Sequence, residues 1–172
     1  MVTIHHRDQL SLGNNREALG LSAFHWGILI QPKNPKGNDS HAFDVSDASI
    51  PDPLTRRDLN PNHDWHFRPK LAVNPLLSGR LLGRIMIGKV PKDFTDDAIE
   101  ALLKTVPLPV KNATPNQNCA TWIVAAIQLL QDRGLAEPFN VSDFMSKALA
   151  LGDQWLGNPS PNNTHNYTSR PG

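Results

Sequence analysis

The sequence has few of the features that mark several large classes of protein. It contains a single cysteine among 172 residues, so no disulfide can form within the chain. Its formal net charge is +1 and only 19% of its residues are charged, which provides no strong field of one sign for nucleic acid or an anionic membrane. No apolar run approaches the ~20 residues of a membrane span, and the first residues lack the apolar core of a signal peptide. We therefore expect a cytoplasmic protein that neither binds nucleic acid nor spans a membrane.

Length and local composition predict one folded domain with flexible ends. A chain of 172 residues can build one sizeable hydrophobic core but not two comfortable ones. Residues 1–20 are polar and show little periodicity, so we expect a flexible arm there. Residues 158–172 consist largely of Asn, Pro, Ser, Thr and Gly, with too little apolar surface to offset the entropy of ordering. We therefore expect a domain over 21–157 and a flexible tail after it.

The single cysteine lies at the start of the strongest helical pattern in the chain. After Asn118 and Cys119, an apolar stripe at helical spacing includes Trp122, Ile123 and Leu130, and it predicts a helix that packs on a sheet. The N-terminus of a helix presents unpaired backbone N–H groups and a partial positive charge, and both favour a thiolate. Cys119 is therefore a candidate nucleophile. The alternative is an inert thiol, because free cysteine is among the most often buried residue types.

Two candidate partner histidines lie on neighbouring predicted strands. The apolar run at 23–30 contains His25, and the return strand at 40–45 contains His41. A hairpin that bends near residues 34–36 would bring His25 and His41 close to opposite one another, where Cβ atoms lie ~4.5–5.5 Å apart. A thiol nucleophile needs such a base, and the base needs a third polar group that orients it. Asp44 is a weaker substitute for His41, because alternation along a regular strand puts it on the opposite face from His41.

The remaining patterns complete an α+β fold class. Strands are expected around Trp65 and Ile85, the segment 94–104 is expected to form a helix with Thr95 as its N-cap, and a further helix is expected near 142–149. These elements predict an antiparallel sheet packed against the helix that carries Cys119 at its N-terminus. The long loop at 46–62 follows the His41 strand, so we expect the site to open beside it. Its charged residues either contact a substrate or are simply solvated, namely Asp47, Asp52, Arg56, Arg57 and Asp58.

The order of these groups resembles that of a known family. The segments His25-Trp26-Gly27-Ile28 and Asn118-Cys119 are similar to motifs of the lecithin:retinol acyltransferase-like family, which has a circularly permuted papain-like fold. The resemblance implies that Cys119 is the nucleophile, His25 its general base and His41 the orienting third member. We also expect Trp26, Trp122 and Asn118 to contact substrate. The whole chain also resembles small fungal proteins, a likeness that implies no activity.

Two differences limit what the resemblance implies. Cys119 is followed by Ala-Thr-Trp, where family members typically have an acidic residue, a histidine and a phenylalanine. The chain also ends in polar residues, whereas the membrane-active members carry an apolar tail. Lipid substrates and membrane attachment are therefore not implied.

These patterns favour a thiol-dependent hydrolase or acyltransferase. It would act through an acyl-cysteine intermediate on an amide, ester or thioester of a small molecule or peptide, without a cofactor or metal. A cysteine peptidase or a protease that removes protein conjugates is the nearest alternative. Two other classes remain open: a zinc site formed by Cys119, His25 and His41, and a non-catalytic binding protein with a buried thiol. The sequence does not indicate the oligomeric state.

Overall fold

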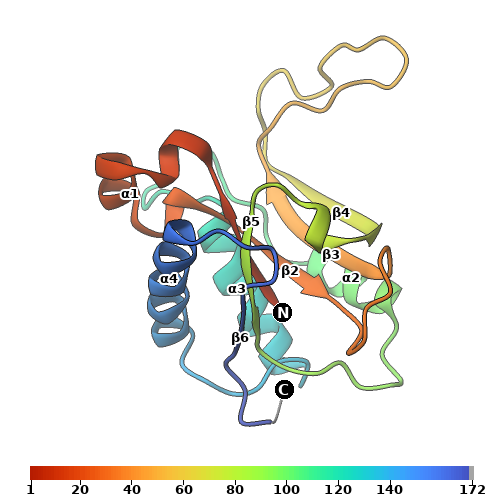
Figure 1. The fold of residues 1–172 in the computed structure, drawn as a ribbon. Coiled ribbons are helices and arrows are strands. Elements are labelled where there is room, and N and C mark those ends of the chain that lie inside the picture. Colours follow the sequence, from red (N-terminus) through yellow and green to blue (C-terminus); the bar gives the residue numbers. More distant parts are fainter. Residues whose placement is uncertain (171–172) are drawn as a thin grey trace.

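The sheet at the centre of this protein takes strands from both ends of the chain. The computed structural model describes residues 1–170. Its elements, in chain order, are β1 (Val2–His6), η1 (Asp8–Ser11), α1 (Gly13–Leu19), η2 (Gly20–Ala23), β2 (Phe24–Ile30), β3 (Ser40–Ser46), β4 (His66–Val73), η3 (Pro75–Leu77), β5 (Leu81–Met86), α2 (Asp96–Lys104), α3 (Cys119–Asp132), α4 (Val141–Gly157) and β6 (Thr164–Asn166). The strands lie in the order β4-β3-β2-β1-β5-β6 (Figure 1). Every neighbouring pair is antiparallel except β5 and β6, which are parallel.

The first residues form a central strand, and the prediction of a flexible arm over residues 1–20 is wrong. Strand β1 pairs with β2 on one side and with β5 on the other, so its backbone groups are bonded on both edges. Val2 and Ile4 alternate toward the helices and are 0% exposed. Residues 13–19 form helix α1. Strand β1 could not be predicted from the sequence because its pattern is too short. Only two apolar residues alternate with polar ones in a strand of five residues.

The C-terminal segment is also docked on the domain. Strand β6 pairs with β5, and the Tyr167 ring packs against Phe139 and Phe144 with centroids 5.1 and 5.0 Å apart. Glu137 accepts hydrogen bonds from the backbone N–H and the hydroxyl of Ser169. The predicted flexible tail is therefore wrong as far as residue 170. Its last two residues, 171–172, lie outside the described residues.

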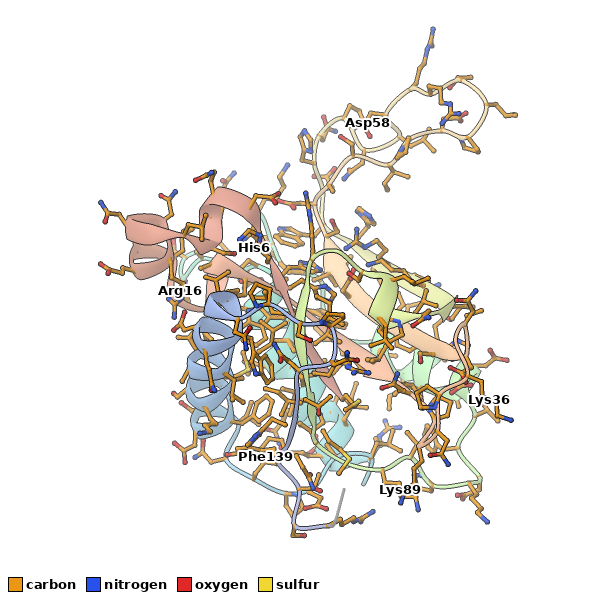
Figure 2. The ribbon with its side chains drawn as sticks, in the orientation of Figure 1. His6, Arg16, Lys36, Asp58, Lys89 and Phe139 are labelled. Carbon is orange, nitrogen blue, oxygen red and sulfur yellow. The ribbon has the colours of Figure 1, made fainter. Side chains whose placement is uncertain are left out.

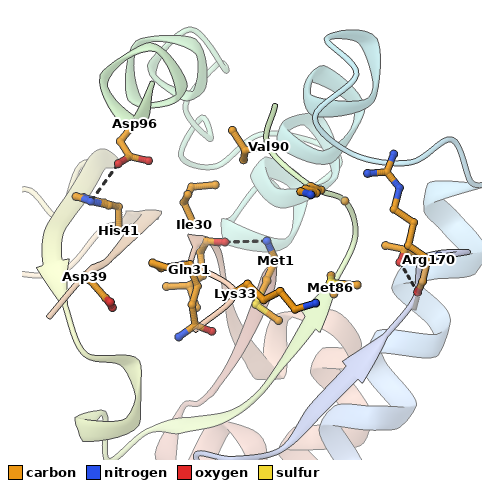
Figure 3. A pocket seen from close by; sticks show the side chains of 15 residues that line it. Met1, Ile30, Gln31, Lys33, Asp39, His41, Met86, Val90, Asp96 and Arg170 are labelled. Carbon is orange, nitrogen blue, oxygen red and sulfur yellow. Dashed lines mark hydrogen bonds and ion pairs between the residues drawn. The ribbon is translucent and has the colours of Figure 1, made fainter. Parts of the chain in front are cut away.

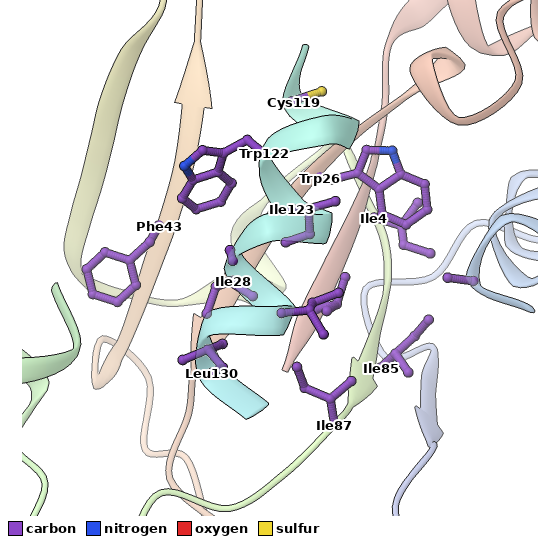
Figure 4. Packing of buried hydrophobic residues seen from close by; sticks show 14 of the residues in the cluster. Ile4, Trp26, Ile28, Phe43, Ile85, Ile87, Cys119, Trp122, Ile123 and Leu130 are labelled. Atoms are coloured by element: carbon purple, nitrogen blue, oxygen red, sulfur yellow. The ribbon is translucent and has the colours of Figure 1, made fainter. Parts of the chain in front are cut away.

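Helices cover one face of the sheet and form the hydrophobic core there. Trp26 and Ile28 of β2 and Phe43 of β3 point toward α3, where they meet Trp122 and Ile123 (Figure 4). All five of these side chains are at most 1% exposed. Helix α3 thus packs on β2 and β3, as the apolar stripe predicted. The α+β class, the largely antiparallel sheet and the position of Cys119 at the start of a helix on that sheet are confirmed.

A second helix packs on the sheet through glycine. Helix α4 lies against β5, and a Cβ atom at Gly83 would overlap the ring of Trp155. Within α4, Gly152 lies beside Phe24, where a Cβ would come within 3.1 Å of its ring. The helix therefore continues past the expected end near residue 149, and the lack of a side chain at Gly152 lets α4 approach the sheet.

Candidate functional site

The start of α3 is fixed by reciprocal hydrogen bonds around Asn118. The Asn118 side-chain oxygen accepts from the backbone N–H of Ala120 at 2.8 Å, and Thr121 Oγ1 accepts from the backbone N–H of Asn118 at 2.9 Å. This capping box sets where the helix begins. The Asn118 amide also donates to Ser22 Oγ at 2.8 Å, which ties the helix end to the segment before β2. Cys119 is consequently held as the first residue of α3.

The Cys119 thiol lies against the beginning of β2. Its Sγ donates to the carbonyl oxygen of Phe24 at 3.7 Å, and Phe24 directly precedes His25. The residue as a whole is only 2% exposed. Hydrogen bonding and the charge of Cys119 are among the causes that raise the pKa of the His25 imidazole. The thiol that the sequence proposed as nucleophile therefore lies against the residue next to the proposed base.

Strands β2 and β3 separate at the end of the sheet where Cys119 lies. The β2–β3 ladder reaches only to the pair Gly27 and Asp44. In the part of the chain that is described, residues 24–26 have no partner on β3, while Val45 and Ser46 pair with β4 instead. The strands are thus unpaired at the position that the His25 side chain occupies.

Asp44 occupies the position of the third member beside His25. Asp44 Oδ2 lies 3.3 Å from His25 Nε2, and the Asp44 side chain is 6% exposed. The register explains this contact, because Asp44 pairs with Gly27 and therefore shares a sheet face with Gly27 and His25. Gly27 leaves little spare room, since a Cβ there would lie 3.0 Å from Thr3 Oγ1. With Nε2 directed at Asp44, Nδ1 is the ring nitrogen left for another partner.

Two basic residues of β4 hold the Asp44 carboxylate in place. Arg68 Nε donates to Oδ1 at 2.7 Å, and Arg68 Nη2 donates to Oδ2 at 3.1 Å. Lys70 Nζ donates to Oδ2 at 2.9 Å. Arg68 Nη2 also lies 3.4 Å from His25 Nε2. A buried carboxylate with this many donors stays ionised and has little freedom to rotate.

These contacts shift the pKa values of His25 and Asp44 in opposite directions. Burial lowers the pKa of His25, but hydrogen bonds to Asp44 and Cys119 and the charges of both groups outweigh it and raise the pKa to about 9. Burial raises the pKa of Asp44, but hydrogen bonds from His25 and Arg68 and the charges of His25 and Lys70 hold it well below its usual value. At neutral pH the pair is an imidazolium and a carboxylate.

A second histidine, His5, faces His25 from β1. The two residues pair across β1 and β2, and their ring centroids are 6.0 Å apart. Burial, together with the positive charges of His25 and Lys70, lowers the pKa of His5 to about 3. His5 is therefore neutral where His25 is charged.

His41 does not lie at this site, which corrects the predicted register. Strand β3 pairs His41 with Ile30, five residues along β2 from His25. Five residues span about 17 Å of strand, and an odd number puts the two side chains on opposite faces. His41 Nε2 instead lies 3.4 Å from Asp96 Oδ2 at the start of α2. The alternation that placed Asp44 opposite to His41 was correct, and it is the reason that Asp44 reaches His25.

His41 lines a separate cavity of about 750 Å³ at the other end of β2 (Figure 3). His41 and Asp96 form one side of this cavity, Arg170 lies at the opposite side, and Ile30 and Lys33 come from the end of β2 and the loop after it. Among the described residues, no group of three or more His, Cys, Asp and Glu side chains is arranged to hold a metal ion. The set of Cys119, His25 and His41 that we considered as zinc ligands is not assembled, because His41 lies elsewhere.

The predicted substrate contacts belong to the core or to the helix cap. Trp26 is 0% exposed and its indole N–H donates to the carbonyl oxygen of Leu21 at 2.7 Å. Trp122 is 1% exposed and packs against Phe67 with ring centroids 6.2 Å apart. Both indoles are enclosed by protein, so the prediction that they contact substrate is wrong in this structure. The Asn118 side chain is partly exposed, but its oxygen and its nitrogen are both bonded within the protein.

The loop at 47–65 projects away from the domain at the same end of the sheet as Cys119. It joins the last residue of β3 to the first of β4, and Figure 1 shows it extending beyond the rest of the chain. Asp58 lies in this projection, far from Lys89 at the opposite end of the molecule (Figure 2). Asp52 and Asp58 accept backbone hydrogen bonds within the loop. At its base, Lys111 donates to the carbonyl oxygen of Asn62, which joins the loop to the segment that leads to Cys119.

Comparison with known proteins supplies a family but no activity. The profile described as "Family of unknown function (DUF6914)" matches residues 6–146, which is most of the chain. The chain belongs to this family. The DUF6914 match includes His25, Asp44, Arg68, Lys70 and Cys119, and it ends within α4. Searches of curated proteins and of solved structures found no match. None of the helices within residues 1–170 has the length and apolar composition of a membrane span.

Sequence reasoning missed three residues of this cluster as site residues: Arg68, Lys70 and His5. Arg68 and Lys70 are two residues apart on one strand, so they share a sheet face. That spacing is a usable signal once the strand expected around Trp65 is extended through Pro69 to Val73. His5 was assigned to the flexible arm and therefore received no role.

Proposed function

We propose that this protein is a thiol hydrolase or acyltransferase in which Cys119 is the nucleophile, His25 its proton-transfer partner and Asp44 the orienting carboxylate. The observation that carries the proposal is that His25 Nε2 contacts Asp44 Oδ2 at 3.3 Å while the Cys119 thiol bonds the carbonyl oxygen of Phe24, the residue directly before His25. Acyl transfer through a thiol requires a cysteine, a histidine that exchanges protons with it and a carboxylate that orients the histidine. Asp44 thus takes the role that the resemblance gave to His41.

The first chemical step forms an acyl-cysteine. Cys119 reacts as a thiolate beside the protonated His25, and its sulfur attacks the carbonyl carbon of an amide, ester or thioester, so that a bond from sulfur to carbon forms. His25 then gives the proton to the leaving amine, alcohol or thiol as the original bond to the carbonyl carbon breaks. Asp44 stays ionised and stabilises the imidazolium throughout. Arg68 and Lys70 keep the carboxylate in the orientation that this step needs.

The second step releases the acyl group and restores the thiol. Water, or a bound amine, alcohol or thiol, gives a proton to His25 and attacks the acyl carbon as the bond from that carbon to the Cys119 sulfur breaks, which restores the ionised thiol beside the protonated His25. The backbone N–H of Cys119 has no acceptor within the described part of the chain, so it is available to the oxyanion that forms in both steps. The identity of the attacking group decides between hydrolysis and transfer.

The arrangement supports a relationship to circularly permuted papain-like folds. His25 lies on β2, Asp44 on β3 and Cys119 at the start of a helix packed on both strands, and they occur in the chain in that order. The same order was the basis of the resemblance to the lecithin:retinol acyltransferase-like family. The proposal that this is a permuted papain-like domain therefore rests on the site and on helix α3 together.

The test is formation of an acyl adduct. The protein is incubated with an activity-based thiol probe and with a panel of amides, esters and thioesters, and the mass of the intact chain is followed. We expect an adduct on Cys119 that is absent from Cys119→Ala, and the donors that react identify the substrate class. Peptide amides in the panel distinguish a peptidase from an enzyme that acts on small molecules.

One observation favours a different assignment, in which Cys119 is an inert core residue. The residue is 2% exposed and its thiol is bonded to a carbonyl oxygen, as expected of a structural cysteine. This alternative predicts that every reagent labels Cys119 only after the protein is denatured. Labelling of the folded protein that slows in His25→Ala contradicts it, because an inert thiol does not depend on His25.

A further inference from the structure

Three cations share a single carboxylate beside Cys119. His25, Arg68 and Lys70 each lie within 3.3 Å of an Asp44 carboxylate oxygen. Among the residues described, neither Arg68 nor Lys70 forms an ion pair with a second carboxylate. With His25 protonated and Cys119 ionised, the cluster has three positive charges and two negative ones. It therefore retains a net positive charge when the nucleophile is ready to react.

The positive charge of this cluster faces solvent and the negative charge does not. The Arg68 and Lys70 side chains are 35% and 40% exposed, whereas Asp44 is 6% exposed. Both cations also keep unused donors. Arg68 Nη1 makes no hydrogen bond within residues 1–170, and Lys70 uses one of its three donors on Asp44. A solute that approaches His25 from solvent therefore meets cations with free N–H groups.

A cavity of about 360 Å³ lies next to Lys70 on the same face of the sheet. Asp44 and Gly27 line it from the sheet, and Val73 and Leu77 give it an apolar wall from β4 and η3. This volume lies within the range of small-molecule sites. The cavity thus offers space for an uncharged body immediately beside the free donors of Lys70.

We propose that Arg68 and Lys70 form an anion-binding subsite, so that the acyl substrate carries a carboxylate or another anionic group close to its reacting carbonyl. The anionic group binds the free donors of Arg68 and Lys70, and a compact apolar part of the substrate occupies the adjacent cavity. Arginine and lysine both bind such groups through charge-assisted hydrogen bonds. This inference rests on the proposed function, since it concerns the substrate of the same thiol.

Two alkylating reagents that differ in charge test the subsite. Iodoacetate is anionic and iodoacetamide is neutral, and both alkylate the Cys119 sulfur by displacing iodide. The ratio of their labelling rates is measured by intact mass for the wild-type protein, Lys70→Met, Lys70→Gln and the control Lys147→Met. Lys147 is exposed on α4, away from the site. Within one protein the ratio cancels changes in thiol reactivity and in folding, so it reports the charge at the site.

We expect the ratio of iodoacetate to iodoacetamide labelling to fall roughly two- to fivefold in both Lys70 variants, as for an exposed charge pair. Lys147→Met should keep the wild-type ratio. In the wild type, added salt from about 20 to about 500 mM should lower the ratio, because it screens exposed charges. Equal ratios in the wild type and both Lys70 variants would overturn the subsite and leave the proposed function standing. Failure of both reagents to label folded protein, with normal labelling after denaturation, would overturn the proposed function itself.

Discussion

At the scale of single residues, Asp44 controls the charge of His25. Two of the causes that raise the pKa of His25 come from Asp44, namely a hydrogen bond and a negative charge, while burial acts against them. Arg68 and Lys70 in turn keep Asp44 ionised by bonding both of its oxygens. The protonation state of the histidine beside the thiol therefore depends on residues of β3 and β4.

Replacing Asp44 by asparagine should lower the pKa of His25 from about 9, because burial then acts against weaker raising effects. An NMR titration of the His25 ring protons measures this directly. Alkylation of Cys119 near neutral pH should also slow, since a smaller share of His25 is then protonated and able to stabilise a thiolate.

His41→Gln is the matched control for that substitution. It removes a histidine that bonds Asp96 and lies at the other end of β2, so both the titration of His25 and the labelling rate should stay at their wild-type values. If His41→Gln lowers the pKa of His25 and Asp44→Asn does not, the assignment of Asp44 as the orienting group is wrong.

At the scale of elements, the cap of α3 positions Cys119, the proposed nucleophile. Asn118→Ala removes the bonds to Ala120 and Ser22, and should cost about 1 kcal/mol of stability, as is typical for a lost helix cap. It should also change the rate of Cys119 labelling, because Cys119 follows the cap directly. Urea unfolding and intact-mass labelling measure the two effects.

Asn140→Ala is the control that separates an effect on the position of Cys119 from an effect on the global stability of the protein. Asn140 caps α4 by accepting from the backbone N–H of Asp143 at 3.1 Å, so its loss should reduce stability by a similar amount. Labelling of Cys119 should not respond, because this cap lies at the start of a different helix. Equal changes in labelling for the two variants would mean that the rate follows global stability and not the position of α3.

The elements also show why one part of the site was predictable and another was not. The start of α3 depends on neighbours in sequence, such as Asn118 and Thr121, and local patterns therefore predicted it. The partner of His25 depends on the pairing of β2 with β3. That register is set by a nine-residue connection and by contacts with other strands. The observed register differs from the expected one by five residues along β2, an odd number that puts His41 on the other face, and this is why His41 was chosen in place of Asp44.

At the scale of the whole molecule, the ends of the chain join the sheet through pairings that are distant in sequence. Strand β1 lies between β2 and β5, and β6 adds to β5 almost 80 residues later. Neither strand has enough apolar residues to be recognised alone, because each is short and is stabilised by the strands beside it. The core of α3 with β2 and β3 was predictable since its apolar patterns are long. The domain boundaries at 21 and 157 were not.

The paired histidines His5 and His25 give the folded molecule two opposing responses to pH. The pKa of His25 is raised to about 9, so its contribution to stability is complete below its unfolded value near 6.5 and is lost as the pH rises through about 9. The pKa of His5 is lowered to about 3 by burial. Unfolded His5 therefore binds a proton below about pH 6.5 that folded His5 does not, and this reduces stability as the pH falls.

Urea unfolding of His25→Gln and His5→Gln should therefore give free-energy differences from wild type with different pH dependence. The loss of stability in His25→Gln should be larger near pH 6 than near pH 9.5, because the raised pKa stabilises only the protonated form. In His5→Gln, stability relative to wild type should improve from about pH 8 to about pH 4.5, because the variant no longer has a buried histidine that resists protonation. Lys147→Met, which changes an exposed charge on α4, should show little pH dependence.

Differences that stay constant across this range for both histidine variants would contradict the opposite protonation states of the pair. They would also remove the imidazolium that the proposed reaction at Cys119 requires.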